Sequence, residues 1–483
     1  MTQHKKESIN RIKPDTKTRE KNLAKNTVIL AIGQLSSKVF TFFLLPLYTS
    51  LLTPEDFGTI DALQTIISLS LYFVTLQIEN AVFRFLVENR SNEKEQYGYI
   101  TGALIVLLAM TVISFSVIFV INHMILIPYV GLFMMALWTQ SLYLFVSNLA
   151  RGLGKNWDYS IASFTVTVTS LLTNIILIVG LKVGAASILV ALAFSNFVGF
   201  IYISCRVRIW KLIRFEAIDR NKVNQMLRYS FPLIPNAISW WIANTSDRLL
   251  IICFLGTTFN GIYAAANKIP TIYTTIFSVF NTAWTESVAL SIDDVDRNEY
   301  IESMINSGFK LFSFIAFGMI TCVSITFKLL IGSQYAEAYN HVFILIIAIF
   351  INSMCSLFGG VLGGLKDTKV IGWTTVVGAV VNALINILFI RVIGLYAASL
   401  STLLSYLVIY MVRLHAVKQS IPIKISTKYL WQCVMVLFIV AYGYFSKVII
   451  VNVAILCLLV VWGGYQNRAL LIPLFNRLKL KFN

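Results

Sequence analysis

Long apolar stretches alternate with short polar connections along almost the whole chain. The hydrocarbon core of a membrane takes about 20 apolar residues of helix, and fourteen stretches of about that length follow one another. Polar residues within them recur at spacings of three and four, which is the spacing of one helix face. The pattern predicts an all-α polytopic membrane protein with helices at about 26–52, 57–83, 98–121, 125–150, 157–180, 184–205, 229–255, 258–289, 307–331, 341–363, 369–390, 394–412, 429–446 and 448–466.

The basic residues predict the orientation of these helices. Of the 483 residues 57% are hydrophobic and 13% charged, which is a composition of the polytopic membrane class. Residues 1–25 carry no cleavage signal and predict a basic cytoplasmic tail. Of the 39 lysines and arginines, 32 then fall in cytoplasmic segments and four outside, which places both termini in the cytoplasm. The net charge of +17 therefore indicates no nucleic-acid partner.

Several kinds of chemistry lack the residues that they need. The six cysteines are spread singly over apolar segments and are interpreted as small core residues, and the four histidines are isolated, which indicates no zinc site. No glycine-rich phosphate loop is present. The longest outside connection, GSQYAEAYN at 332–340, has nine residues and is too short for a catalytic domain. We expect no catalytic residue, no metal and no cofactor.

The chain contains a weak internal repeat, as many transporters do. Residues 173–187 align with 385–399 at a shift of 212, and residues 51–66 align with 254–269 at a shift of 203. Each repeat holds six helices, and an even number gives both halves the same orientation around an axis normal to the membrane. The predicted units are the tail 1–25, an N-lobe 26–215, a C-lobe 216–415, and two extra helices with a basic cytoplasmic C-terminus at 416–483.

Polar stripes occur at equivalent positions of the two halves. On the second helix, polar residues recur on one face from Asp61 to Glu79, and the eighth helix carries a matching stripe. Under the repeat, Gln64, Ser68 and Thr75 coincide with Asn267, Thr271 and Ser278. The stripes predict either a water-filled cavity between the halves or hydrogen bonds between helices. Charged residues on or beside them favour the cavity: Asp61, Glu79, Lys268 and Glu286.

The seventh helix carries two charges in the middle of an apolar run. Trp240, Trp241, Asn244, Asp247 and Arg248 lie at spacings of three and four on one face. A charge in the bilayer centre costs several kcal/mol, so this face is expected to meet the cavity or another helix. Since adjacent residues do not face each other on a helix, Asp247 and Arg248 are expected to have separate partners. Lys38 of the first helix is a candidate partner for Asp247.

These segments resemble a known family. FPLIPNAISWWIANTSDRLLIICFLG, GIYAAANKIPTIYTTIFSVFNTAW, LPLYTSLLTPEDFGTIDALQTI and ENAVFRF are similar to the bacterial polysaccharide transporter family, the lipid-linked oligosaccharide flippases. The resemblance covers about 26–415. It implies two six-helix lobes, location in the bacterial plasma membrane, and transfer of a polyprenyl-pyrophosphate-linked repeat unit to the outer leaflet for O-antigen, capsule or exopolysaccharide. It also implies polysaccharide polymerase and chain-length proteins as partners.

The candidate site residues follow from this substrate. Cations suit a pyrophosphate, aromatic rings suit sugars, and amides suit hydroxyl groups; we therefore predict substrate contacts by Lys38, Arg248, Lys268, Trp240, Trp241, Asn244, Gln64 and Asn267. The tryptophans are equally interpretable as packing residues. Coupling or gating is predicted for Asp247, Asp61, Glu79, Arg84 and Glu286. Arg84 and Glu79 form either a gate or a surface ion pair, and Asp247 is either an ion-dependent switch or a permanent counter-ion.

Two other function classes compete with the flippase. A proton- or sodium-coupled multidrug exporter would share the fold, but cationic drugs favour an acidic cavity, whereas Lys38, Arg248 and Lys268 lie within predicted helices. A membrane glycosyltransferase or polymerase would need catalytic residues on an outside loop.

Overall fold

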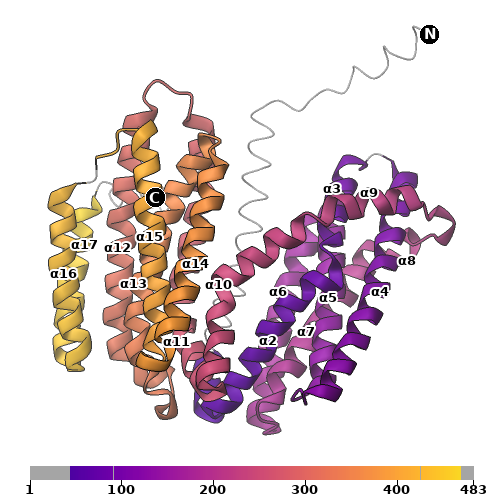
Figure 1. Cartoon of the computed structure of the whole chain (residues 1–483), viewed down its shortest axis with the longest axis horizontal. Coiled ribbons are helices and arrows are strands. Elements are labelled where there is room, and N and C mark those ends of the chain that lie inside the picture. Colours follow the sequence, from indigo (N-terminus) through magenta and orange to yellow (C-terminus); the bar gives the residue numbers. More distant parts are fainter. Residues whose placement is uncertain (1–43, 91, 425, 469–483) are drawn as a thin grey trace, which may run out of the picture.

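Every described element of the chain is a helix. The computed structural model describes residues 44–468 apart from Ser91 and Ile425, and that part of the chain contains no strand. Two helical lobes stand side by side, and α16 and α17 pack on the outer side of the second lobe (Figure 1). The structure thus has the all-α fold, with two lobes and two added helices, that the apolar pattern predicts.

The first lobe is formed by the helices that precede residue 208. They are α2 (Pro54–Thr75), α3 (Ile78–Glu88), α4 (Glu93–Met124), α5 (Val130–Gly152), α6 (Asn156–Ile175), the π-helix η1 (Ile176–Gly180) and α7 (Ala186–Val207). Short elements connect the lobes: α8 (Ile209–Leu212), η2 (Phe215–Ala217) and α9 (Arg220–Ser230), which packs against α3 and α4. Residues 44–51 are helical, and the predicted helix at 26–52 otherwise lies outside the described residues together with Lys38.

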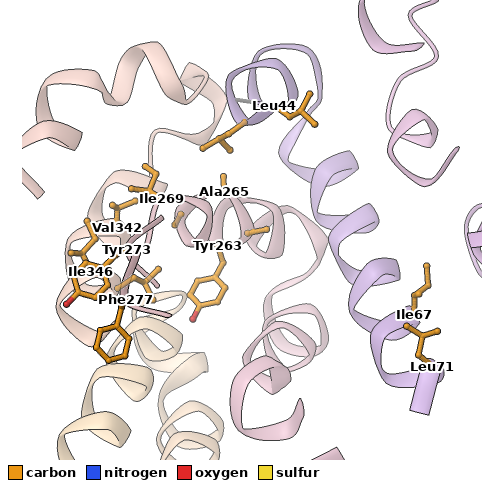
Figure 2. Close-up of a cluster of buried hydrophobic side chains, with 14 of the residues drawn as sticks. Leu44, Ile67, Leu71, Tyr263, Ala265, Ile269, Tyr273, Phe277, Val342 and Ile346 are labelled. Atoms are coloured by element: carbon orange, nitrogen blue, oxygen red, sulfur yellow. The ribbon is translucent and has the colours of Figure 1, made fainter. Parts of the chain in front are cut away.

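The second lobe is built around one long helix. It contains α10 (Leu233–Leu255), α11 (Thr257–Ser291), α12 (Arg297–Leu330), η3 (Ser333–Tyr335), α13 (Ala338–Gly364), α14 (Thr368–Ile393) and α15 (Tyr396–Ser420). α11 packs along α13. Figure 2 shows Tyr273 and Phe277 of α11 beside Val342 and Ile346 of α13, in a cluster of buried side chains. This apolar face fixes α11 in the lobe and leaves its opposite face free for polar residues.

The added helices are α16 (Thr427–Ser446) and α17 (Ile449–Gln466), and they contact α12. Two tyrosines join α16 to α13. The Tyr339 hydroxyl donates to the Tyr444 carbonyl at 2.6 Å, the Tyr444 hydroxyl donates to the Tyr339 carbonyl at 2.5 Å, and the rings stack with centroids 4.1 Å apart. Because both hydroxyls are satisfied, the aromatic pair is stable in an apolar environment.

The predicted helix at 57–83 is wrong in one respect, because the structure breaks it. α2 ends at Thr75, and Leu76 and Gln77 follow with φ of 48° and 58°, in the left-handed region. The backbone N–H of Gln77 donates to the Thr75 hydroxyl at 3.1 Å, which replaces a helical acceptor lost at the break. Neither glycine nor proline marks this position, so the residue pattern did not indicate it.

The number of membrane spans depends on α10 and α11. Eleven described helices are long and apolar enough to cross a membrane, and each coincides with a predicted span. α10 and α11 coincide with the predicted helices at 229–255 and 258–289 but are too polar to be among the eleven. The total of fourteen spans therefore stays a prediction, as do the unit boundaries drawn from the repeat.

The lobes meet at one end through two glycines that the repeat aligns. A Cβ on Gly58 of α2 would lie 1.8 Å from the Thr257 carbonyl oxygen, and one on Gly261 of α11 would lie 1.9 Å from that of Pro54. Each helix therefore places its glycine against the start of the other, as a pseudo-two-fold axis requires. From this end, which we call the closed end, the lobes diverge (Figure 1).

We predict that Gly58→Ala destabilises the protein. The added methyl group overlaps a backbone carbonyl, and overpacking of this kind costs about 1–3 kcal/mol. Gly318→Ala is the matched control, because a Cβ there meets nothing within 4 Å in the described structure. The melting temperature in detergent should fall for Gly58→Ala and stay unchanged or rise for Gly318→Ala. Equal melting temperatures of the two variants would contradict this prediction, because they would show that the closed end accommodates the added methyl group.

Candidate functional site

An ion pair joins the lobes next to the glycine contact. Arg248 of α10 lies 2.7 Å from the Asp61 carboxylate of α2 through its Nη1 atom. The Asp61 side chain is 3% exposed and that of Arg248 27%. Of the ion pairs in the described part of the chain, this one alone connects the two lobes. Loss of one partner of a buried pair typically costs about 3–5 kcal/mol, so the pair contributes to closure as a unit.

Two neutral contacts extend this lobe interface. The Asn260 amide of α11 donates to the Gly58 carbonyl at 2.8 Å and lies 3.4 Å from Asp61. The indole N–H of Trp241 donates to the Ser68 hydroxyl of α2 at 2.8 Å. Polar residues of the predicted stripe thus face the other lobe, and Trp241 is buried there as a contact between lobes.

Lys268 is the second predicted cation. It lies on α11, is partly buried, and is close enough to Asp61 and Arg248 for their charges to interact with it. It forms no ion pair within the described residues. Lys268 thus adds a second positive charge near the ion pair, and the cluster of Asp61, Arg248 and Lys268 carries a net charge of +1 when all three are ionised.

Asp247 has its own partners inside the second lobe, as its position next to Arg248 predicts. Its carboxylate accepts from the Thr402 hydroxyl at 2.9 Å, the Asn386 amide at 3.0 Å and the Tyr263 hydroxyl at 3.2 Å. All three donors are neutral. No lysine or arginine of the described chain forms an ion pair with Asp247. Arg248, its neighbour in the sequence, pairs with Asp61 instead.

The Asp247 network is incomplete on one side. The Asn386 amide donates to Asp247, and its own oxygen is buried without a hydrogen-bond partner among the described residues. Asn382 donates to the Thr402 hydroxyl at 3.4 Å. Polar side chains of α11, α14 and α15 thus meet at the Asp247 carboxylate of α10.

The remaining predicted substrate residues lie along α10, α2 and α11. Trp240 is 52% exposed, and it lines a groove of about 600 Å³ between α10 and α14. Asn244 is exposed one turn away. Gln64 and Asn267 are partly buried, and the Asn267 amide donates to the carbonyl of Tyr263. The two adjacent tryptophans therefore serve different sides of α10, since Trp240 lines the groove with α14 and Trp241 meets Ser68 of the other lobe.

Glu79 and Arg84 are not brought together. Glu79 is 2% exposed at the start of α3, and one of its carboxylate oxygens is buried without a partner among the described residues. Arg84 is exposed and forms a surface ion pair of 2.8 Å with Glu88. Glu286 is exposed on α11. The structure thus separates the predicted gating residues into a surface pair, an exposed carboxylate and a buried one.

Sequence reasoning missed several polar residues that the structure places at these sites. Asn386 had a signal, because the repeat aligns it with Asn174, but no function was inferred from that match. Asn260, Tyr263 and Thr402 gave no distinguishing pattern among the many polar residues of their helices. Arg413 was interpreted only as a basic residue of the cytoplasmic side, although the structure buries it.

Comparison with known proteins identifies the family of this chain. The model of the family described as "Polysaccharide biosynthesis protein" matches residues 23–285, which is more than half of the chain. An uncharacterized membrane protein of Methanocaldococcus jannaschii is 22% identical over 416 residues, which cover 82% of this chain and 98% of that protein.

Solved structures share the fold. The lipid II flippase MurJ, in an inward closed conformation, superposes with a TM-score of 0.70 at 14% identity over 92% of this chain and 100% of MurJ. An inward-facing multidrug transporter of the MATE family, in the MOP superfamily, gives a TM-score of 0.64 at 14% identity over 80% of this chain and 98% of its own. The chain is thus a multi-pass membrane protein that belongs to the polysaccharide biosynthesis protein family and has the fold of MurJ and the MATE transporters.

Proposed function

We propose that this transporter flips a polyprenyl-pyrophosphate-linked oligosaccharide from the cytoplasmic to the outer leaflet of a bacterial plasma membrane. The observation that carries the proposal is the cluster of Asp61, Arg248 and Lys268, where cations of one lobe meet a carboxylate of the other. A pyrophosphate with two or more negative charges competes with Asp61 for both cations. Substrate binding is therefore linked to the contact that holds the lobes together.

The proposed direction follows from the predicted orientation. With both termini in the cytoplasm, the closed end lies at the outer face and the lobes diverge toward the cytoplasm, where lipid-linked sugars are assembled. Pyrophosphate that reaches Arg248 would release Asp61 and weaken the closed end, which favours the opposite opening. This is alternating access by population shift, with the substrate binding one state differently from the other.

The groove between α10 and α14 suits the remainder of the substrate. Its volume is about 600 Å³, and Trp240, Asn236 and Ser239 line it together with apolar residues of α14. An indole ring beside amide and hydroxyl groups is a suitable surface for a sugar. Membrane lipid on the same side would accommodate the polyprenyl chain.

Asp247 is proposed as the coupling residue. A carboxylate whose donors among the described residues are all neutral, next to an Asn386 oxygen without a partner there, suits a proton or a sodium ion. Because α10 carries both Asp247 and Arg248, occupancy of the ion site would affect the position of Arg248 at the closed end. The alternative, a permanent counter-ion, requires a cation beside Asp247; none of the described chain pairs with it, and Lys38, its predicted partner, lies outside the described residues.

The alternatives differ in what they require of the same residues. A cationic-drug exporter would need a net negative site, whereas the cluster at the closed end is net positive. A glycosyltransferase or polymerase is not the class that the family and fold indicate. We propose O-antigen, capsule or exopolysaccharide as the product class, and polymerase and chain-length proteins as partners.

We predict that Arg248→Gln and Lys268→Gln each reduce transport at least tenfold while the protein still inserts and folds. Each loses a charge-assisted contact to pyrophosphate, which contributes about 1.5–3 kcal/mol. Arg248→Lys should keep partial activity because lysine lacks the planar fork. The assay is translocation of a labelled lipid-linked oligosaccharide by purified protein in liposomes. Full transport by the double Gln variant would contradict this role.

A charge reversal separates the gate from the substrate contact. Asp61→Asn should lengthen the distance between spin labels on Glu55 and Gln334, which are exposed near the closed end on different lobes. Asp61→Arg combined with Arg248→Asp should restore the short distance but not transport, because a carboxylate then replaces the cation that meets pyrophosphate. If the double variant also transports, Arg248 acts only as a gate residue.

For Asp247 we predict that Asp247→Asn retains substrate binding but loses the dependence of transport on an imposed sodium or pH gradient. The amide keeps the shape of the carboxylate and removes its charge. Liposomes with and without each gradient provide the measurement, and Glu299→Gln serves as control because Glu299 is an exposed carboxylate at the start of α12, outside the network. A well-folded Asp247→Asn protein with unchanged gradient dependence would refute the coupling role.

A further inference from the structure

Arg413 is a buried cation of the second lobe that the proposed mechanism does not use. It lies on α15 and is 7% exposed. Its guanidinium donates to the Cys355 carbonyl at 2.9 Å and the Thr374 hydroxyl at 3.0 Å. It also donates to the Thr375 hydroxyl at 3.1 Å and the Ile371 carbonyl at 3.3 Å. All four acceptors are neutral.

The charge of Arg413 is not compensated within the described chain. None of the ion pairs there includes it. A guanidinium has five N–H donors, and four hydrogen bonds to described residues leave one N–H without an acceptor. A buried charge is normally paired, because its removal from water costs several kcal/mol. The neutral acceptors hold the group in place but leave its charge available to an anion.

A polar pocket lies against this guanidinium. Its volume is about 120 Å³, and it is lined by residues of α10, α13, α14 and α15, among them Trp240, Asn244, Asn352, Ser405, Tyr406 and Arg413. A single water needs about 10–15 Å³ by a comparable measure, so the pocket has room for one small charged group and not for a sugar chain. It contains no carboxylate.

The pocket adjoins the proposed substrate path. It shares the lining residues Trp240, Thr375 and Ala379 with the groove between α10 and α14. Along α15, Thr402, Tyr406 and Arg413 lie at spacings of four and seven, on one helix face, so the same face carries the Asp247 network and the pocket. Arg248 pairs with Asp61 at the closed end, where Tyr335, which precedes α13, donates to the Leu52 carbonyl. Arg413 contacts Cys355 in the second half of α13 and therefore lies farther from the closed end.

We propose that Arg413 and its pocket form a second oxyanion-binding subsite, separate from Arg248 and Lys268, that takes an anionic group of the substrate. This rests on the proposed flippase function. The oxyanion is either a phosphate group of the lipid carrier or the carboxylate of an acidic sugar, and both accept hydrogen bonds from a guanidinium. A substrate that binds first at Arg413 would be held on the open side before its pyrophosphate reaches Arg248.

Anion-dependent stabilisation of the full-length protein in detergent tests the subsite. Sodium pyrophosphate, sodium glucuronate and sodium chloride are compared at equal sodium concentration, with the melting temperature as readout. The background is Arg248→Gln combined with Lys268→Gln, which removes the two cations of the cluster at the closed end. We expect pyrophosphate or glucuronate to raise the melting temperature, and Arg413→Gln to increase the half-maximal concentration about tenfold or more. The effective anion identifies the source of the oxyanion.

Thr374→Val is the control for a purely structural role. It removes one acceptor of Arg413 without reaching the pocket, so it should lower the melting temperature but keep the anion-dependent rise. If Arg413→Gln does not fold, Asn352→Leu tests the same pocket with Arg413 intact and should also weaken the anion effect. The subsite is refuted if neither anion acts, or if the anion effect persists unchanged in Arg413→Gln or, where that variant does not fold, in Asn352→Leu. Translocation by the wild type, measured separately, reports on the flippase function itself.

Discussion

Close packing of α2 against α11 is the constraint on which the rest of the structure depends. The two helices approach so closely that only glycine fits at Gly58 and Gly261. This approach places the Asn260 amide on the Gly58 carbonyl and brings Asp61 within reach of Arg248. A local feature without charge therefore determines where charged groups of the two lobes meet, and it makes one end of the molecule the closed end.

The two adjacent charged residues of α10 have different partners. Asp247 and Arg248 point in different directions, so one meets the interior of its own lobe and the other meets the opposite lobe. Because α10 carries both residues, a movement of α10 caused at Asp247 would also move Arg248. The proposed coupling between the ion site and the Asp61–Arg248 ion pair therefore requires only this one helix.

Positive charge in the second lobe follows a consistent pattern. Arg248 is paired with Asp61, Lys268 forms no ion pair in the described chain, and the acceptors of Arg413 among the described residues are all neutral. A soluble protein would solvate such groups, but within a membrane they remain attractive to anions. Under the proposed function, an anionic lipid would meet Arg413 on the open side and would compete with Asp61 for Arg248 at the closed end.

The sequence by itself determined the helices and the polar positions of α10, because apolar length and helical periodicity are local properties of the chain. Its internal repeat predicted the two lobes and aligned Gly58 with Gly261. Only the tertiary structure decided that Asp61 is the partner of Arg248, that Asp247 and Arg248 meet different lobes, and that Arg413 is buried without an ion pair among the described residues. Those outcomes depend on contacts between helices distant in sequence, and periodicity contains no information about which polar face meets which.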